Sequence, residues 1–180
     1  MVNVHKYLFG DIYEWAGTFR KETLYKSERV LSGGFAEYAD YHEIETRLER
    51  LLQEHANIDW RKNAKCGEVV SDFLLELWTI HPFREGNTRT CITFLWHYLK
   101  GKGVEFQVAL LRNNPMYVRD ALVMANYDQK EYLRRIIADA LQGETQESEY
   151  LMNEEQAGEQ YKIAQADYEA FREKYSIKKD

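Results

Sequence analysis

Only two prolines, Pro82 and Pro115, interrupt the 180 residues of this chain. Proline removes a backbone donor and ends or kinks a helix, so a chain with so few prolines can form long helices. Together with a content of ten glycines, this favours a mostly helical fold over a turn-rich β fold. Hydrophobic residues make up 44% of the chain, which is enough to bury the core of one domain of ordinary size.

Apolar residues recur at helical spacing along most of the chain. The most apolar segment, from Cys66 to Ile80, is expected to form a central helix. Further helices are expected over residues 4–16, 40–55, 92–101, 105–112, 115–127 and 131–141. Asp40 is expected to cap the second of these. Residues 20–38 instead predict a small β-hairpin around Gly33-Gly34.

Residues 144–180 differ from the rest of the chain in charge and in the spacing of their apolar residues. They hold ten acidic residues and five Lys or Arg, a net charge of −5, so only −1 of the chain's −6 belongs to residues 1–143. An apolar stripe at heptad-like spacing is formed by Tyr161, Ala164, Tyr168, Phe171 and Tyr175. We therefore predict a domain over residues 1–143, followed by an acidic helical extension over 144–180.

Charge and patterning exclude several classes of function. A net charge of −6 argues against a nucleic-acid binder, which would carry a basic excess. No stretch approaches 18 consecutive apolar residues, and the N-terminal residues do not form a cleavable secretory signal, so no membrane segment is expected. We predict a cytoplasmic protein, or one secreted into a host by a route without a cleavable signal peptide. Cys66 and Cys91 are expected to be reduced.

The segment from His81 to Arg89 concentrates reactive residue types in one loop. Pro82 disfavours helical geometry at His81, so this histidine is expected just past a helix end, where it could act as a general base. Glu85 offers a hard oxygen ligand suited to Mg²⁺. Gly86 allows close approach of an anion to the backbone N–H groups that open the next helix, and Arg89 can add a phosphate contact.

Each part alone has an ordinary structural explanation. A histidine at a helix end is usually packed, and a Gly-Asn turn before a helix is usually only a turn. The combination of base, metal ligand and anion site within nine residues favours phosphate-ester chemistry on a nucleotide. The other histidines, His5, His42, His55 and His97, are interpreted as structural or exposed.

The loop sequence HPFREGNTR resembles the signature HxFx[DE]GN[GK]RxxR of the Fic (filamentation induced by cAMP) family. The resemblance extends to His5–Phe9, Tyr13–Gly17 and Arg20 before the motif, and to Tyr117–Leu141 after it. It implies a helical bundle with a β-hairpin flap over the active-site loop. It also implies transfer of AMP from ATP to a Tyr, Ser or Thr hydroxyl of a target protein, with Mg²⁺.

The resemblance assigns a role to each matched residue. His81 would deprotonate the target hydroxyl, Phe83 would anchor the loop and Glu85 would hold Mg²⁺. The phosphates would be bound by Gly86, Asn87, Thr88 and Arg89. The flap would hold the target segment by strand pairing, through Val30, Leu31, Ser32, Gly33 and Gly34.

Two positions depart from the signature. Thr88 replaces its Gly or Lys, and Ile92 replaces its second arginine, which in the family holds the terminal phosphate. Residues 145–149 fit the first five positions of the family's inhibitory motif [ST]xxxE[GN], but Tyr150 ends the match. The alternatives are a nucleotide-binding pseudoenzyme, a transferase of another phosphate-containing group, and a helical protein-interaction module. The sequence leaves open whether the protein binds a regulatory partner or antitoxin and whether it forms a homo-oligomer.

Overall fold

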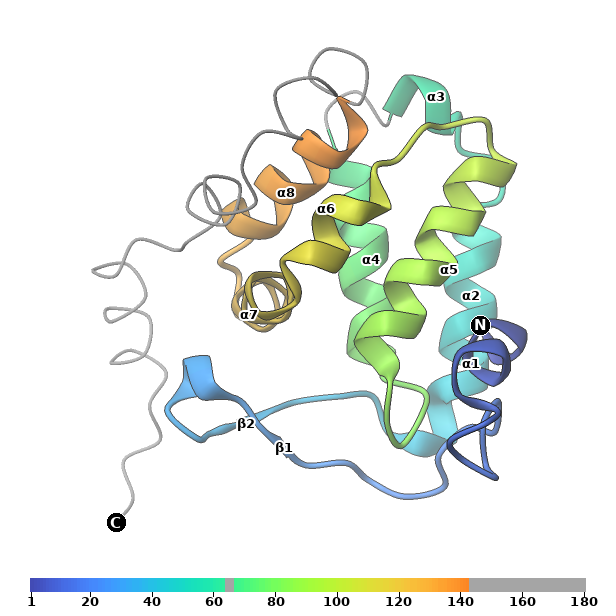
Figure 1. Ribbon diagram of the computed structural model, residues 1–180, viewed down its shortest axis with the longest axis vertical. Coiled ribbons are helices and arrows are strands. Elements are labelled where there is room, and N and C mark those ends of the chain that lie inside the picture. Colours follow the sequence, from blue (N-terminus) through green and yellow to red (C-terminus); the bar gives the residue numbers. More distant parts are fainter. Residues whose placement is uncertain (64–66, 143–180) are drawn as a thin grey trace. The chain divides into compact units, whose positions relative to one another are not determined.

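The computed structural model describes residues 1–63 and 67–142, which divide into two compact units (Figure 1). The first unit consists of Met1–Leu24 and Glu37–Glu105. The second consists of Tyr25–Ala36 and the described residues from Phe106 on. Cys66 and the predicted acidic extension lie outside the described residues, so the boundary near residue 143 stays a prediction.

Helices make up most of the first unit. They are α1 (Val2–Phe9), α2 (Ile44–His55), α3 (Trp60–Asn63), α4 (Glu68–Ile80) and α5 (Asn87–Gly101). Helix α4 packs against both α2 and α5, and its side chains Phe73, Leu74 and Leu77 are wholly buried (Figure 1). The prediction of a central helix ending at Ile80 is therefore confirmed. Asp40 caps a short 3₁₀ helix, Tyr41–Glu43, that leads into α2.

The first helix is shorter than its apolar spacing predicts. It ends at Phe9, and residues 10–16 form successive turns in which the N–H groups of Ile12 and Tyr13 both bond to the carbonyl of Phe9. Glycine is about 1 kcal/mol less favourable than alanine in a helix, so Gly10 weakens continuation at this point. The side chain of Ile12 is 64% exposed, which shows that the predicted buried face does not extend this far.

The second unit contains a hairpin and three helices. Strands β1 (Lys26–Ser27) and β2 (Phe35–Ala36) pair antiparallel, which confirms the predicted small hairpin. The helices are α6 (Val108–Asn113), α7 (Pro115–Ala125) and α8 (Glu131–Leu141), and α7 packs against α8. In the described ranges no helix is both long enough and apolar enough to span a bilayer.

Between the two strands the chain forms a 3₁₀ helix, Arg29–Leu31, where an extended segment was expected. Two adjacent carboxylate–guanidinium pairs fix this turn to α7. Arg119 donates to Glu28 from Nε at 2.9 Å and from Nη2 at 2.7 Å, and Arg29 donates in the same two-point manner to Asp120. Both carboxylates are almost fully buried, so these long-range pairs hold the turn against α7.

Replacing Arg119 by methionine should destabilise the second unit. The Glu28 carboxylate, 3% exposed, would lose its two-point partner, whereas Arg119 itself is 34% exposed. We expect a loss of about 2 kcal/mol, below the roughly 3–5 kcal/mol of a fully buried pair. Urea unfolding measures the loss, with Arg112→Met as the control because Arg112 is an exposed arginine on α6. Equal losses in the two variants would contradict the assignment.

Candidate active site

His81 lies immediately after α4, as Pro82 predicts, in a left-handed conformation with φ of 48°. Its ring is buried, stacked on Tyr38 with centroids 3.8 Å apart and edge-on to Trp78. Nδ1 lies 3.1 Å from the carbonyl oxygen of Trp78. Since a carbonyl can only accept, Nδ1 carries the proton of the neutral ring and Nε2 is the nitrogen able to take one. This is the arrangement that a general base requires.

Arg20 holds the backbone around His81. Its guanidinium is buried and donates to four backbone carbonyls, those of Glu22, Ala39, Ile80 and His81. The contact with the His81 carbonyl is made by Nε at 2.8 Å, and the N–H of Arg20 donates to the carbonyl of Pro82 at 2.9 Å. Burial lowers the pKa of Arg20, and the nearby Asp40 carboxylate opposes that shift.

His5 supports the other end of the loop. Its Nδ1 accepts the N–H of Gly17 at 2.9 Å, so Nε2 carries the proton and donates to the carbonyl of Glu85 at 3.0 Å. The ring is buried and stacks on Phe83 at 3.9 Å. The expectation that His5 is structural is confirmed, but its position against the reactive loop had no signal in the sequence. Burial lowers the pKa of His5, against the smaller raising effect of the Glu85 hydrogen bond.

The loop is closed by contacts among its own residues. Phe83 is wholly buried, and its N–H donates to Asn87 Oδ1 at 2.8 Å while its carbonyl accepts from Asn87 Nδ2 at 2.6 Å. Gly86 has φ of 76°, and a Cβ there would overlap the Phe9 ring, so only glycine fits. The side-chain amide of Asn87 is thus bonded within the loop. Only the backbone N–H of Asn87 could bind an anion.

Helix α5 begins at Asn87 and brings three further motif positions to the loop. The hydroxyl of Thr88 accepts a hydrogen bond from Trp78 Nε1 at 3.0 Å, so this side chain is turned toward α4. Arg89 is exposed, with its guanidinium carbon 4.6 Å from the centroid of the Phe9 ring. Ile92, one turn further on, is 9% exposed and offers no donor. Glu85, two residues before the start of α5, is exposed.

All the loop residues that the sequence singled out therefore lie in the first unit, and the predicted docking residues lie in the second. Of those docking residues, Val30 and Leu31 are buried within the 3₁₀ turn and Gly34 is buried as well. Only Ser32 and Gly33 are exposed. The expectation of an extended conformation at residues 29–31 is wrong: these residues form a 3₁₀ turn, which ion pairs hold against α7.

The family model for the Fic/DOC family matches residues 1–99, more than half of the chain. The chain belongs to this family. It is 33% identical over 106 residues to the protein adenylyltransferase VbhT of Bartonella schoenbuchensis and 35% identical over 124 residues to y4lH of Sinorhizobium fredii. These alignments cover 57% and 67% of this chain but only 21% and 60% of the relatives, so the chain spans less than two thirds of either.

A solved structure shares this fold. The structure of BepC, a VirB-translocated effector protein from Bartonella tribocorum with bound AMPPNP, superposes with a TM-score of 0.60. The match covers 77% of this chain and 71% of the BepC chain, with 20% sequence identity. At this identity the match supports a common fold, and the mostly helical class with a small hairpin is confirmed.

The buried neutral His5 should make stability depend on pH. Because its folded pKa lies below the value near 6.5 of an unfolded histidine, acid protonates the unfolded state first. Stability should fall as pH decreases from about 7.5 to about 5, by at most about 1.4 kcal/mol per pH unit for this one group. Urea unfolding at both pH values measures this fall in the free energy of unfolding. The fall should be smaller in His5→Gln than in the native protein, and it should be unchanged in the control His97→Gln, because His97 is exposed. Identical slopes in all three proteins would exclude His5 as the linked group.

Proposed function

We propose that this chain is a protein adenylyltransferase, which transfers AMP from ATP to a Tyr, Ser or Thr hydroxyl of a target protein. Membership of the Fic/DOC family supports this, as do the name of the relative VbhT and the AMPPNP bound to BepC. The observation that carries the proposal is the orientation of His81. Its Nδ1 donates to the Trp78 carbonyl, so Nε2 is the ring nitrogen that can act as a base, and His81 lies at the start of the loop that leads into α5.

In the proposed step, Nε2 of His81 takes the proton of the target hydroxyl. The hydroxyl oxygen of the target attacks the α-phosphorus of ATP at the same time. An oxygen–phosphorus bond forms, and the bond from that phosphorus to the bridging oxygen of pyrophosphate breaks. Pyrophosphate leaves with the bond's electron pair, and the imidazolium returns its proton to solvent. Arg20 holds the backbone of His81, and the Trp78 carbonyl and the Tyr38 ring hold its imidazole, so little reorganisation is needed during the reaction.

The phosphates are proposed to bind at the N-terminus of α5. The first N–H groups of this 15-residue helix have no intrahelical partner, and they attract anions. Within this set Gly86, Asn87 and Thr88 would contribute backbone N–H groups, and Arg89 a charged contact from the first turn. The Thr88 side chain is held by Trp78, so the departure from the signature at this position leaves the helix start intact.

Glu85 is proposed as the protein ligand of Mg²⁺. Among the described residues there is no group of three or more His, Cys, Asp or Glu side chains able to hold a metal ion. A single exposed carboxylate still fits Mg²⁺, which commonly binds one or two carboxylates together with substrate phosphates and water. When bound, the ion would neutralise charge on the phosphates.

Ile92 supports a second candidate, the transfer of another phosphate-containing group. Its side chain belongs to the apolar face of α5 and cannot bond to a terminal phosphate. A charge-assisted hydrogen bond contributes roughly 1.5–3 kcal/mol, so its absence weakens the preference for a triphosphate. The identity of the target segment, a regulatory partner or antitoxin, self-association and a cytoplasmic location stay predictions from the sequence.

Replacing His81 by asparagine should abolish transfer and keep the fold. The Asn amide can still donate to the Trp78 carbonyl, but it cannot take a proton near neutral pH, and loss of a general base costs about 10²–10⁴-fold. The measurement is incubation with a panel of labelled nucleotides and cell lysate, followed by mass spectrometry of the modified residues. His97→Asn is the control, since His97 is exposed on α5. Undiminished transfer by His81→Asn would contradict the mechanism, and a transferred group other than AMP would favour the second candidate.

A further inference from the structure

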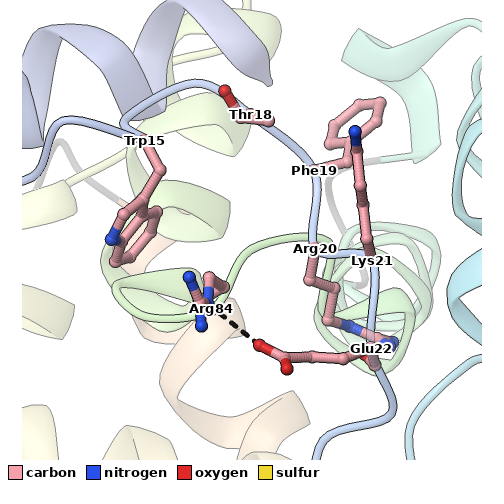
Figure 2. A pocket seen from close by; sticks show the side chains of 7 residues that line it. All are labelled: Trp15, Thr18, Phe19, Arg20, Lys21, Glu22 and Arg84. Atoms are coloured by element: carbon pink, nitrogen blue, oxygen red, sulfur yellow. Dashed lines mark hydrogen bonds and ion pairs between the residues drawn. The ribbon is translucent and has the colours of Figure 1, made fainter.

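A cavity of about 250 Å³ opens in the first unit, against the HPFREGN loop. Residue 15 and residues 18–22 form most of its lining, and Arg84 of the loop completes it. Figure 2 shows Trp15 and Arg84 on one side of the opening and Phe19 and Lys21 on the other. The proposed AMP transfer leaves this cavity without a role.

The size of the cavity limits what it can hold. Pockets that enclose drug-sized ligands measure about 300–1,000 Å³. A space of about 250 Å³ is therefore small for a nucleoside triphosphate and suits a single side chain of a polypeptide. The two aromatic side chains, Trp15 and Phe19, would contact the apolar stem of such a side chain.

The charges around the cavity select an anion. Nε of Arg84 pairs with Glu22 at 3.0 Å, and both side chains are about half exposed, at 53% and 55%. Lys21 is exposed, and within the described part of the chain no carboxylate pairs with it. With the buried Arg20, the lining carries three positive charges and one negative, a net +2 in a chain of net charge −6. A carboxylate is thus attracted to this opening, whereas residues 1–143 as a whole carry a net charge of −1.

The cavity is also tied to the reactive loop. Arg84 is three residues after His81 in the sequence. The segment that lines the cavity is bonded to the same loop, because Arg20 donates to the carbonyls of His81 and Pro82. A polypeptide that presents a hydroxyl to His81 therefore has a second contact point close by.

We propose that this cavity binds an Asp or Glu side chain of the target protein, a few residues from the hydroxyl that receives the nucleotide. The inference rests on the proposed function for the identity of the ligand. The carboxylate would bond to Lys21 and to the terminal nitrogens of Arg84, in competition with Glu22. The enzyme would thereby select modifiable hydroxyls in acidic sequence contexts.

The first test measures binding without catalysis. The probes are the blocked tripeptides Gly-Glu-Gly and Gly-Gln-Gly, titrated into protein with ¹⁵N-labelled tryptophan. We expect the glutamate peptide to shift the Trp15 indole resonance to a plateau, and the glutamine peptide to leave it in place. Lys21→Glu should remove the shift. Lys62→Glu should retain it, because it makes the same charge change at an exposed lysine on α3.

Two results of this titration would overturn the proposal. Equal shifts with both peptides would show that the cavity does not recognise a carboxylate. Equal loss of binding in Lys21→Glu and Lys62→Glu would show that only the net charge of the protein matters. Neither result depends on whether the chain transfers AMP.

The second test connects the cavity to specificity. A library of tyrosine-centred peptides, varied at each flanking position, is incubated with labelled ATP. We expect the native protein to favour Asp or Glu at one fixed position, and Lys21→Glu to lower that preference at least about tenfold, or to reverse it toward Lys. Labelling without any acidic preference would overturn the cavity assignment. Absence of labelling by the native protein would count against the proposed function alone, since the titration decides the binding site independently.

Discussion

The reactive loop depends on one buried cation, the guanidinium of Arg20. Burying a charge costs several kcal/mol unless it is paired or fully hydrogen-bonded. Arg20 meets this requirement by donating to four backbone carbonyls, and two of these, at Ile80 and His81, belong to the C-terminal end of α4. The last carbonyls of a helix lack intrahelical partners and carry the negative end of the helix dipole. Arg20 therefore caps α4 from a distant segment, and in doing so fixes the backbone of His81.

The loop joins two helix ends of opposite polarity. The negative end of α4 is satisfied by Arg20, and the positive end of α5 is left for an anion. His5, Phe83 and Asn87 then determine the path between these ends through one stacked ring pair and three hydrogen bonds. Because all these contacts are made within the chain itself, they fix the backbone of His81 and of the first turn of α5 in the arrangement that the proposed phosphate chemistry requires.

Local signals in the sequence predicted the elements whose formation is local. Apolar periodicity located α4, Pro82 located its end, and the pair Gly33-Gly34 located the hairpin. The sequence did not reveal that Arg20 and His5 meet a loop more than 60 residues away, since a lone Arg or His has no periodicity or spacing to detect. The turn at Arg29–Leu31 was missed for the same reason, because the partners that hold it lie 91 residues away in the sequence.

Chemical rescue of the Arg20→Ala variant shows whether Arg20 positions His81, the proposed general base. Transfer to lysate proteins is measured with and without added guanidinium chloride, and with sodium chloride at the same concentration as the salt control. Circular dichroism confirms that the variant is folded. We expect the variant to transfer AMP about 10²-fold more slowly or worse, as for a misplaced catalytic group. Transfer should recover substantially when guanidinium fills the space and bonds to the carbonyls of Ile80 and His81. Native transfer rates in the folded variant, or a loss that guanidinium does not restore, would contradict this role of Arg20.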